Sequence, residues 1–152
     1  RILTTISAVI NGGTMITPHF GVSISDTETQ RKTNIRYTSK KNVISKETSD
    51  VMKNVLETVV SEGGGKKAAI EGYKVGAKTG TSEKLPRRSG KYIASCMGFA
   101  PAQNPKVIAL VLIDEPSGIY YGGTIAAPVI SKLLDDILPY VDGKEDYGYS
   151  GN

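Results

Sequence analysis

Residues that build metal centres and disulfide frameworks are almost absent from this chain of 152 residues. The single cysteine, Cys96, excludes an internal disulfide, and with the single histidine, His19, it leaves no Cys/His set for zinc. The longest uninterrupted apolar run, 107–113, is far shorter than the roughly 20 residues of a membrane-spanning helix, and no signal-peptide pattern opens the chain. We therefore expect a soluble domain that uses no metal or other cofactor.

The charge balance excludes little. Nineteen Lys and Arg residues against fifteen Asp and Glu give a net charge of +4, which nucleic acid or an anionic surface could use but does not require. The densest basic cluster, Lys84, Arg87, Arg88 and Lys91, surrounds a proline turn and has no aromatic residues interleaved with it. We interpret it as a solvated loop, and we expect no nucleic-acid partner.

Two amphipathic helices are expected in the first half of the chain. Apolar residues recur at helical spacing over 2–10, and Asn11-Gly12-Gly13 then ends that helix. The polar stretch 25–42 is typical of a solvated surface ribbon. A second apolar face runs over 45–60, with Ser45 as the expected N-cap, and a glycine run ends it.

The second half of the chain reads as sheet followed by a helix. Turn residues separate three extended segments, 72–82, 91–99 and 106–113. Their short connections predict an antiparallel three-stranded meander flanked by helices, which is an α+β fold. The third segment is apolar throughout, which is typical of a strand buried on both faces and paired on both sides.

The C-terminal part is expected to hold one more helix and a tail. The apolar stripe predicts the helix over 125–138, with Pro128 in its first turn and Pro139 closing it. The polar and glycine-rich residues 142–152 are predicted to form a flexible tail, so we place the folded part at 1–141.

The segment Lys78-Thr79-Gly80-Thr81 carries the chemistry. A phosphate-binding loop is disfavoured, because Ala77 stands where the second glycine of that motif belongs and Pro86 follows too soon for a helix. An ordinary polar edge strand, in which the lysine deters aggregation, is a second interpretation. The third is the Lys-Thr-Gly motif of penicillin-binding proteins and serine β-lactamases.

The third interpretation is favoured by several landmarks that stand in register along the chain. They are Asn11-Gly12-Gly13, Met15-Ile16-Thr17-Pro18-His19, Gly72-Tyr73, Lys78-Thr79-Gly80-Thr81, Gly98-Phe99-Ala100-Pro101, Tyr121-Gly122-Gly123 and Ala126-Ala127-Pro128-Val129. In this order residues 1 to about 140 resemble the C-terminal part of a class B penicillin-binding transpeptidase domain, of the division and sporulation types. The resemblance implies a β-lactamase/transpeptidase-like fold with a five-stranded sheet, of which three strands belong here.

The resemblance also implies roles for individual residues. Thr79 and Thr81 would grip the carboxylate of a peptidoglycan stem peptide or a β-lactam, since alternate residues of a strand point to one side. The backbone N–H of Thr81 would supply half of an oxyanion hole, Lys78 would add positive potential, and Gly80 would leave room for ligand or neighbouring backbone. We interpret His19 as a loop-packing residue and Cys96 as a small core residue.

Two motifs of the family have no match in the chain. No serine is followed three positions later by lysine, and the one Ser-x-Asn, at 150–152, comes after the Lys-Thr-Gly-Thr strand instead of before it. We therefore expect a fragment of a D,D-transpeptidase whose nucleophile and membrane anchor lie upstream, in an intact protein that works on the extracytoplasmic face. The alternatives are part of a β-lactamase or β-lactam sensor, and a non-enzymatic basic binding module.

We also expect the fragment to self-associate. In a meander of three strands, 106–113 is an edge, so a row of unpaired N–H and C=O groups would lie along the most hydrophobic strand of the chain. The first helix offers a second exposed apolar face.

The missing nucleophile gives a first prediction. Incubated with a labelled β-lactam, the chain should show no covalent adduct by intact-protein mass spectrometry, because no serine here is paired with a lysine that could activate it. A stoichiometric adduct on any serine would contradict both this expectation and the interpretation as a fragment.

Overall fold

The structure, a computed structural model, describes residues 1–141, so the tail expected over 142–152 lies outside the described residues. The chain divides into two compact units, Arg1–Ser49 and a second that begins at Asp50. Each unit is described by itself.

The first unit opens with the expected helix, α1 (Ile2–Ile10), which ends at Asn11. Gly12 and Gly13 follow with φ of +82° and +88°, a conformation that suits glycine. The buried Ser49 holds this turn from across the sequence: its hydroxyl donates to the Val9 carbonyl at 2.7 Å and accepts from the Gly12 N–H at 3.0 Å. The helix end is thereby tied to a residue far away in sequence.

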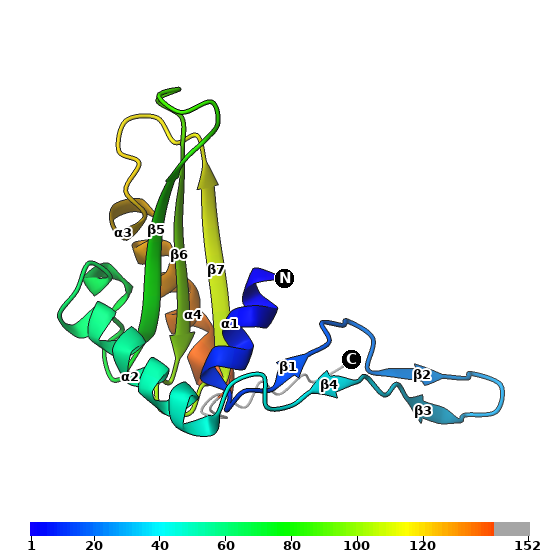
Figure 1. Cartoon of the computed structure of the whole chain (residues 1–152). Coiled ribbons are helices and arrows are strands. Elements are labelled where there is room, and N and C mark those ends of the chain that lie inside the picture. Colours follow the sequence, from blue (N-terminus) through cyan, green and yellow to red (C-terminus); the bar gives the residue numbers. More distant parts are fainter. Residues whose placement is uncertain (142–152) are drawn as a thin grey trace. The chain divides into compact units, whose positions relative to one another are not determined.

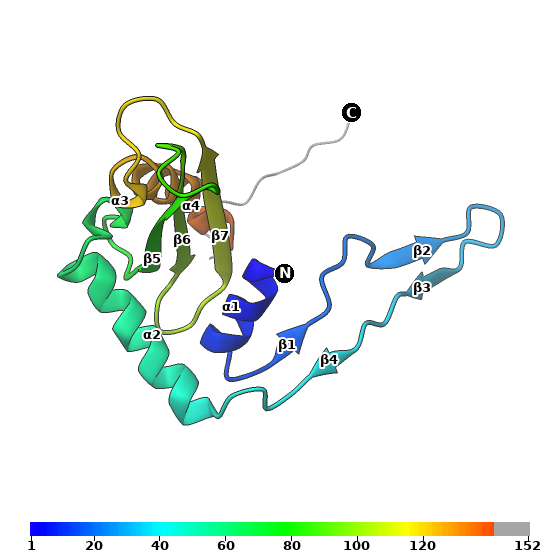
Figure 2. The same cartoon turned by 45° about the horizontal axis from the view of Figure 1, so that its top comes forward.

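The predicted ribbon is present, but it begins at Met15, before the polar stretch 25–42 over which it was expected (Figure 2). It consists of two antiparallel pairs, β1 (Met15–Ile16) with β4 (Ser39–Lys40) and β2 (Ser23–Ser25) with β3 (Lys32–Asn34). Because side chains alternate along a strand, Val22 and Ile24 share one face and Ser23 and Ser25 the other. Val22 and Ile24 are exposed, and Phe20 beside them is fully exposed.

The second helix, α2 (Lys46–Ser61), begins where its cap predicts, because the Thr48 N–H donates to the Ser45 hydroxyl at 3.1 Å. It ends at the glycine run 63–65. A single 3₁₀ turn, η1 (Lys66–Ala68), follows before the sheet begins.

The predicted three-stranded antiparallel meander is present and confirms the α+β fold (Figure 1). Its strands lie in the order β5 (Gly76–Glu83), β6 (Tyr92–Ala100) and β7 (Val107–Asp114). The helices α3 (Gly122–Ile125) and α4 (Ala127–Val141) follow, and α4 covers one face of the sheet. The pairs Thr79↔Cys96 and Cys96↔Val111 fix the register of the three strands.

Three expected boundaries are wrong. The first strand begins at Gly76 instead of position 72, because Gly72 has a φ of +78° and lies in the turn between the bridged residues Ile70 and Tyr73. The helix expected over 125–138 is divided at Ala126 into α3 and α4. Pro139 does not close α4, which continues for two more residues to Val141, so only the last turn of the helix includes the proline.

The expectation that 106–113 is buried on both faces is wrong, whereas the expectation that it is an edge of the three-stranded sheet is confirmed. Among the described residues β7 is an edge strand, paired with β6 alone. Its odd-numbered residues, such as Val111, pack against the α4 core, whereas Leu112 on the other face is 58% exposed. A strand that is apolar throughout can therefore have one buried and one partly exposed face, and its sequence alone does not distinguish this case from burial on both faces.

The core lies between the sheet and α4, where Ala77, Cys96, Ile130 and Leu134 are fully buried. Gly98 of β6 makes this packing possible, because a Cβ at its position would overlap Cγ2 of Ile130. The helix can therefore lie directly on the strand at this point.

Gly98→Ala should consequently lower the free energy of unfolding by about 1–3 kcal/mol, the usual cost of forcing extra volume into a packed core. Gly64→Ala is the matched control, since a Cβ there meets nothing within 4 Å. Urea unfolding of both variants measures the difference. Equal stability of Gly98→Ala and the parent chain would mean that α4 does not contact the strand at Gly98.

Cys96 is the buried core residue that the sequence predicts. Burial raises the pKa of its thiol to about 11, and the positive charge of Lys78 offsets only part of that effect. At pH 8 about one thiol in a thousand is ionised, and the thiolate is the reactive form. Iodoacetamide should therefore label the native chain very slowly, and faster as the pH rises toward 11.

Labelling in 6 M guanidinium supplies the control, because unfolding restores both access and an ordinary thiol pKa. Native labelling at pH 8 as fast as that of the unfolded chain would contradict the core assignment.

Candidate active-site strand

The Lys-Thr-Gly-Thr segment occupies the middle of β5, at the edge of the three-stranded sheet. One side of β5 is paired with β6, and no strand within residues 1–141 pairs with its other side. A row of main-chain N–H and C=O groups is thereby left for an extended peptide, which could add to the sheet as a further strand.

Thr79 and Thr81 point to the side of the sheet where α3 begins. The Thr81 hydroxyl oxygen accepts a hydrogen bond from the Gly122 N–H at 3.1 Å, and the Thr79 methyl carbon lies 3.6 Å from where a Cβ on Gly123 would be. Because the Thr81 oxygen is already an acceptor, its own proton is directed elsewhere and is free to donate. Thr79 is half-buried and Thr81 is exposed. Because side chains alternate along a strand, the two threonines lie on one face of β5, as predicted.

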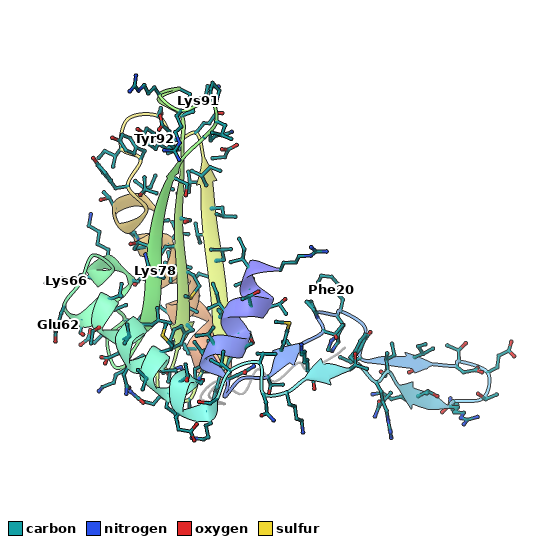
Figure 3. The ribbon with its side chains drawn as sticks, in the orientation of Figure 1. Phe20, Glu62, Lys66, Lys78, Lys91 and Tyr92 are labelled. Carbon is teal, nitrogen blue, oxygen red and sulfur yellow. The ribbon has the colours of Figure 1, made fainter. Side chains whose placement is uncertain are left out.

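Lys78 is exposed, and Figure 3 labels it on β5. Because side chains alternate along a strand, it lies on the opposite face from Thr79 and Thr81. Its ammonium group donates to the Thr79 carbonyl at 2.6 Å, so the charge lies next to the backbone of the strand. The same charge acts on the pKa of Cys96 on the neighbouring strand. Lys78 thus adds positive potential around β5.

Two glycines permit close packing around this part of β5, Gly80 on one face of the sheet and Gly122 on the other. A Cβ on Gly80 would lie 2.6 Å from the Ser95 hydroxyl, and one on Gly122 would overlap the carbonyl oxygens of Gly80 and Ser95. The first turn of α3 therefore touches the backbones of β5 and β6. The close approach of α3 depends on Gly122, and the role that the sequence analysis assigns to Gly80 stays a prediction.

Gly122 and Gly123 are site residues to which the sequence analysis assigns no role. A Cβ on Gly123 would lie 2.5 Å from the carbonyl oxygen of Gly64, in the glycine run after α2. The signal was present as Tyr121-Gly122-Gly123, yet only the fold brings these glycines against Thr81, 41 positions away along the chain.

The β5–β6 hairpin carries an ordered set of charges instead of a binding patch. Lys84 contacts Asp114 at 3.0 Å and Glu115 at 2.8 Å, and Lys91 contacts Glu115 at 3.1 Å. These pairs hold the pKa of Glu115 below its usual value and raise that of Lys84. The cluster is therefore a salt-bridged loop, in agreement with the interpretation from sequence.

His19 and Cys96 stay outside the candidate site. His19 stacks on Tyr37 with ring centroids 3.7 Å apart, and its Nδ1 lies 2.8 Å from the Thr17 carbonyl oxygen, which fits the predicted loop packing. Cys96 faces the α4 core. Residues 1–141 hold no group of three or more His, Cys, Asp or Glu side chains that could ligate a metal ion. No helix in that range is both long and apolar enough to span a bilayer.

Comparison with known proteins assigns the chain to a family. Residues 1–135 match the family described as "Penicillin binding protein transpeptidase domain". The chain is 43% identical over 141 residues to stage V sporulation protein D of Bacillus subtilis, covering 88% of this chain. It is 41% identical over 111 residues, 70% of this chain, to peptidoglycan D,D-transpeptidase FtsI of Buchnera aphidicola subsp. Baizongia pistaciae.

Solved structures agree. The D,D-transpeptidase domain of a peptidoglycan glycosyltransferase from Eggerthella lenta superposes with a TM-score of 0.75 at 27% identity, over 93% of this chain and 32% of that one. The chain spans 22% of the Bacillus relative and 19% of the Buchnera relative. It belongs to the penicillin-binding protein transpeptidase family, of whose domain it forms one part.

Proposed function

We propose that this chain supplies the Lys78–Thr81 wall of a D,D-transpeptidase active site, which cross-links peptidoglycan stem peptides through an acyl-serine intermediate and is acylated by β-lactams. The observation that carries the proposal is the free edge of β5, with a lysine and two threonine hydroxyls directed around it. The nucleophilic serine belongs to another part of the intact protein. That protein is anchored in the membrane with this domain on the extracytoplasmic face.

The hydrogen bonding of Thr81 supports its assigned role. Its oxygen accepts from the Gly122 N–H, so its proton can donate to the carboxylate of a stem peptide or β-lactam. Thr79 offers a second hydroxyl on the same side of the strand. Two donors fixed by the sheet cost little reorganisation when a carboxylate binds.

Lys78 and the Thr81 backbone act on the reacting carbonyl. The Thr81 N–H is assigned as one oxyanion donor, and the Lys78 ammonium stabilises negative charge that develops as the serine attacks. Gly122, which has no side chain, permits the close packing of α3 against the carbonyl oxygen of Gly80 in this strand.

A chimera tests these roles, in which residues 1–135 replace the matched segment of the Bacillus relative. Lys78→Ala should slow acylation by a fluorescent penicillin on the order of 10²-fold or more, through lost transition-state stabilisation. Thr81→Ala should weaken carboxylate recognition while retaining its backbone N–H, and Thr81→Ser should restore most of the loss.

Lys74→Ala, an exposed lysine before β5, is the matched control and should acylate normally. Unchanged acylation in both Lys78→Ala and Thr81→Ala would remove the basis of the proposal. Rapid turnover of the penicillin by the unmutated chimera would point to a β-lactamase instead.

We further infer that the isolated chain self-associates through the open edge of β7. No strand within residues 1–141 covers that edge, and the exposed Leu112 lies beside it. The N-terminal α1, which exposes Ile2 and Leu3, offers the second apolar face.

Sedimentation velocity at micromolar concentration should show dimers or larger species. Leu112→Lys should shift the chain toward monomer, because a charge on an edge strand opposes pairing. Val129→Lys, which also places a charge at an exposed apolar position but on α4, should leave the distribution unchanged. A strictly monomeric parent chain would contradict the inference.

A further inference from the structure

Four charged side chains join the β5–β6 hairpin to the loop 115–121 at one end of the sheet. We call this set, Lys84, Lys91, Asp114 and Glu115, the end clamp. The Lys84 ammonium lies 3.0 and 3.2 Å from the two Asp114 carboxylate oxygens and 2.8 Å from Oε1 of Glu115, and Lys91 lies 3.1 Å from Oε2 of Glu115. Figure 3 labels Lys91 and Tyr92 at this end of the sheet.

The end clamp crosses the sheet. Lys84 directly follows β5 and Asp114 ends β7, while β6 lies between these two strands. Lys84 therefore links strands that share no backbone hydrogen bond. It is the side chain through which the end of the candidate active-site strand contacts the loop after β7.

Glu115 holds the start of that loop in an unusual conformation. Its φ is +48°, in the left-handed region that side chains other than glycine rarely adopt. Its N–H donates to the Tyr92 carbonyl at 2.9 Å, and both lysines of the end clamp contact its carboxylate. These contacts fix the direction in which the chain leaves β7.

The loop then leads directly to the site. Tyr120 stacks on Tyr92 with ring centroids 4.1 Å apart, and two residues later the Gly122 N–H donates to the Thr81 hydroxyl. Glu115 and Tyr120 therefore attach the loop to β6 at two points before it reaches α3. Both attachments precede Gly122 along the chain.

We propose that the end clamp is a positioning device for Thr81, and that Lys84 is a positioning residue which acts through the loop 115–121 and Gly122. The effect of the end clamp on catalysis rests on the proposed function, whereas its effect on the position of Gly122 does not. A change at Lys84 should first loosen the Gly122–Thr81 hydrogen bond and only through it affect a substrate carboxylate.

The exposure of the end clamp makes its effect dependent on salt. Its side chains are 31% to 65% exposed, so added ions screen their attraction. A single exposed pair has a small effect, but here one lysine is shared by two carboxylates and one carboxylate by two lysines. Raising the salt concentration should weaken the clamp in the unmutated chain and have little further effect once Lys84 is removed.

The first experiment uses the 152-residue chain and needs no activity. Amide hydrogen exchange at Gly122, followed by NMR, should be about threefold to tenfold faster in Lys84→Met than in the parent chain. Glu115→Gln is the second variant, should Lys84→Met fold poorly, and Lys84→Arg should restore the parent rate. Arg87→Met, which removes a positive charge from the same hairpin, should not change it.

Raising sodium chloride from 0.05 to 0.5 M should accelerate Gly122 exchange in the parent chain and much less in Lys84→Met. Exchange at Gly98, in the middle of β6, should stay constant in all variants, which separates loss of positioning from general unfolding. Unchanged Gly122 exchange in Lys84→Met and Glu115→Gln would overturn the proposal.

The chimera connects the end clamp to the reaction. Lys84→Met should lower the second-order acylation rate about threefold to tenfold, and less at high salt than at low salt. If Lys78→Ala abolishes acylation and Lys84→Met leaves it unchanged, the proposed function stands and the positioning role is wrong. If neither variant affects acylation, the proposed function fails, while the exchange result still decides whether the end clamp holds Gly122.

Discussion

The contact of Gly122 with the backbones of β5 and β6 is the constraint on which the rest of the candidate site depends. A side chain at this position would overlap the carbonyl oxygens of Gly80 and Ser95, so only glycine allows α3 to begin where it does. From that position its N–H reaches the Thr81 hydroxyl. Gly123, against the Gly64 carbonyl oxygen, extends the same close packing to the turn after α2. The first turn of α3 is thus confined by backbone on two sides.

The residues that pack the core and the residues that suit ligand binding occupy different parts of the sheet. Cys96 and Ala77 face the α4 core, where Gly98 lets the helix lie against the strand. The open edge of β5 carries the groups that suit ligand binding, and Lys78 lies on the face away from α4. This arrangement also raises the pKa of the Cys96 thiol, because burial against α4 outweighs the field of the nearby Lys78.

Much of the fold can be predicted from local sequence, because the signals are local. The Ser45 cap, the glycine pair after α1 and the three strand segments all depend on neighbouring residues, and all are present. The edge position of β7 follows from the meander, but the burial of only one of its faces could not be predicted, since that depends on what packs against the strand. The sequence analysis also ended the last helix at Pro139, whereas α4 continues for two residues beyond it.

The candidate site, too, can be predicted only as far as it depends on neighbouring residues. The Lys78–Thr81 motif identifies its strand from eleven consecutive residues, 72–82, and the order of landmarks identifies its family. Nothing in that segment indicates that Gly122 donates to Thr81 or that Lys84 contacts Asp114 and Glu115, because these partners lie 30 or more positions away. Contacts of this kind follow from the register of the sheet and not from a motif.

The ribbon of the first unit has a consequence for how its sequence can change. Ile24 lies opposite Thr33, and the tip is closed by Asp26, whose carboxylate accepts from the Glu28 and Thr29 N–H groups. Both strands are largely exposed and β3 carries only polar side chains, so no buried face fixes the register of the pair. The register depends instead on the backbone pairing and on the turn that Asp26 closes. Side chains along β2 and β3 can therefore change with little effect on the ribbon, whereas the turn and the residue that closes it are what the ribbon requires.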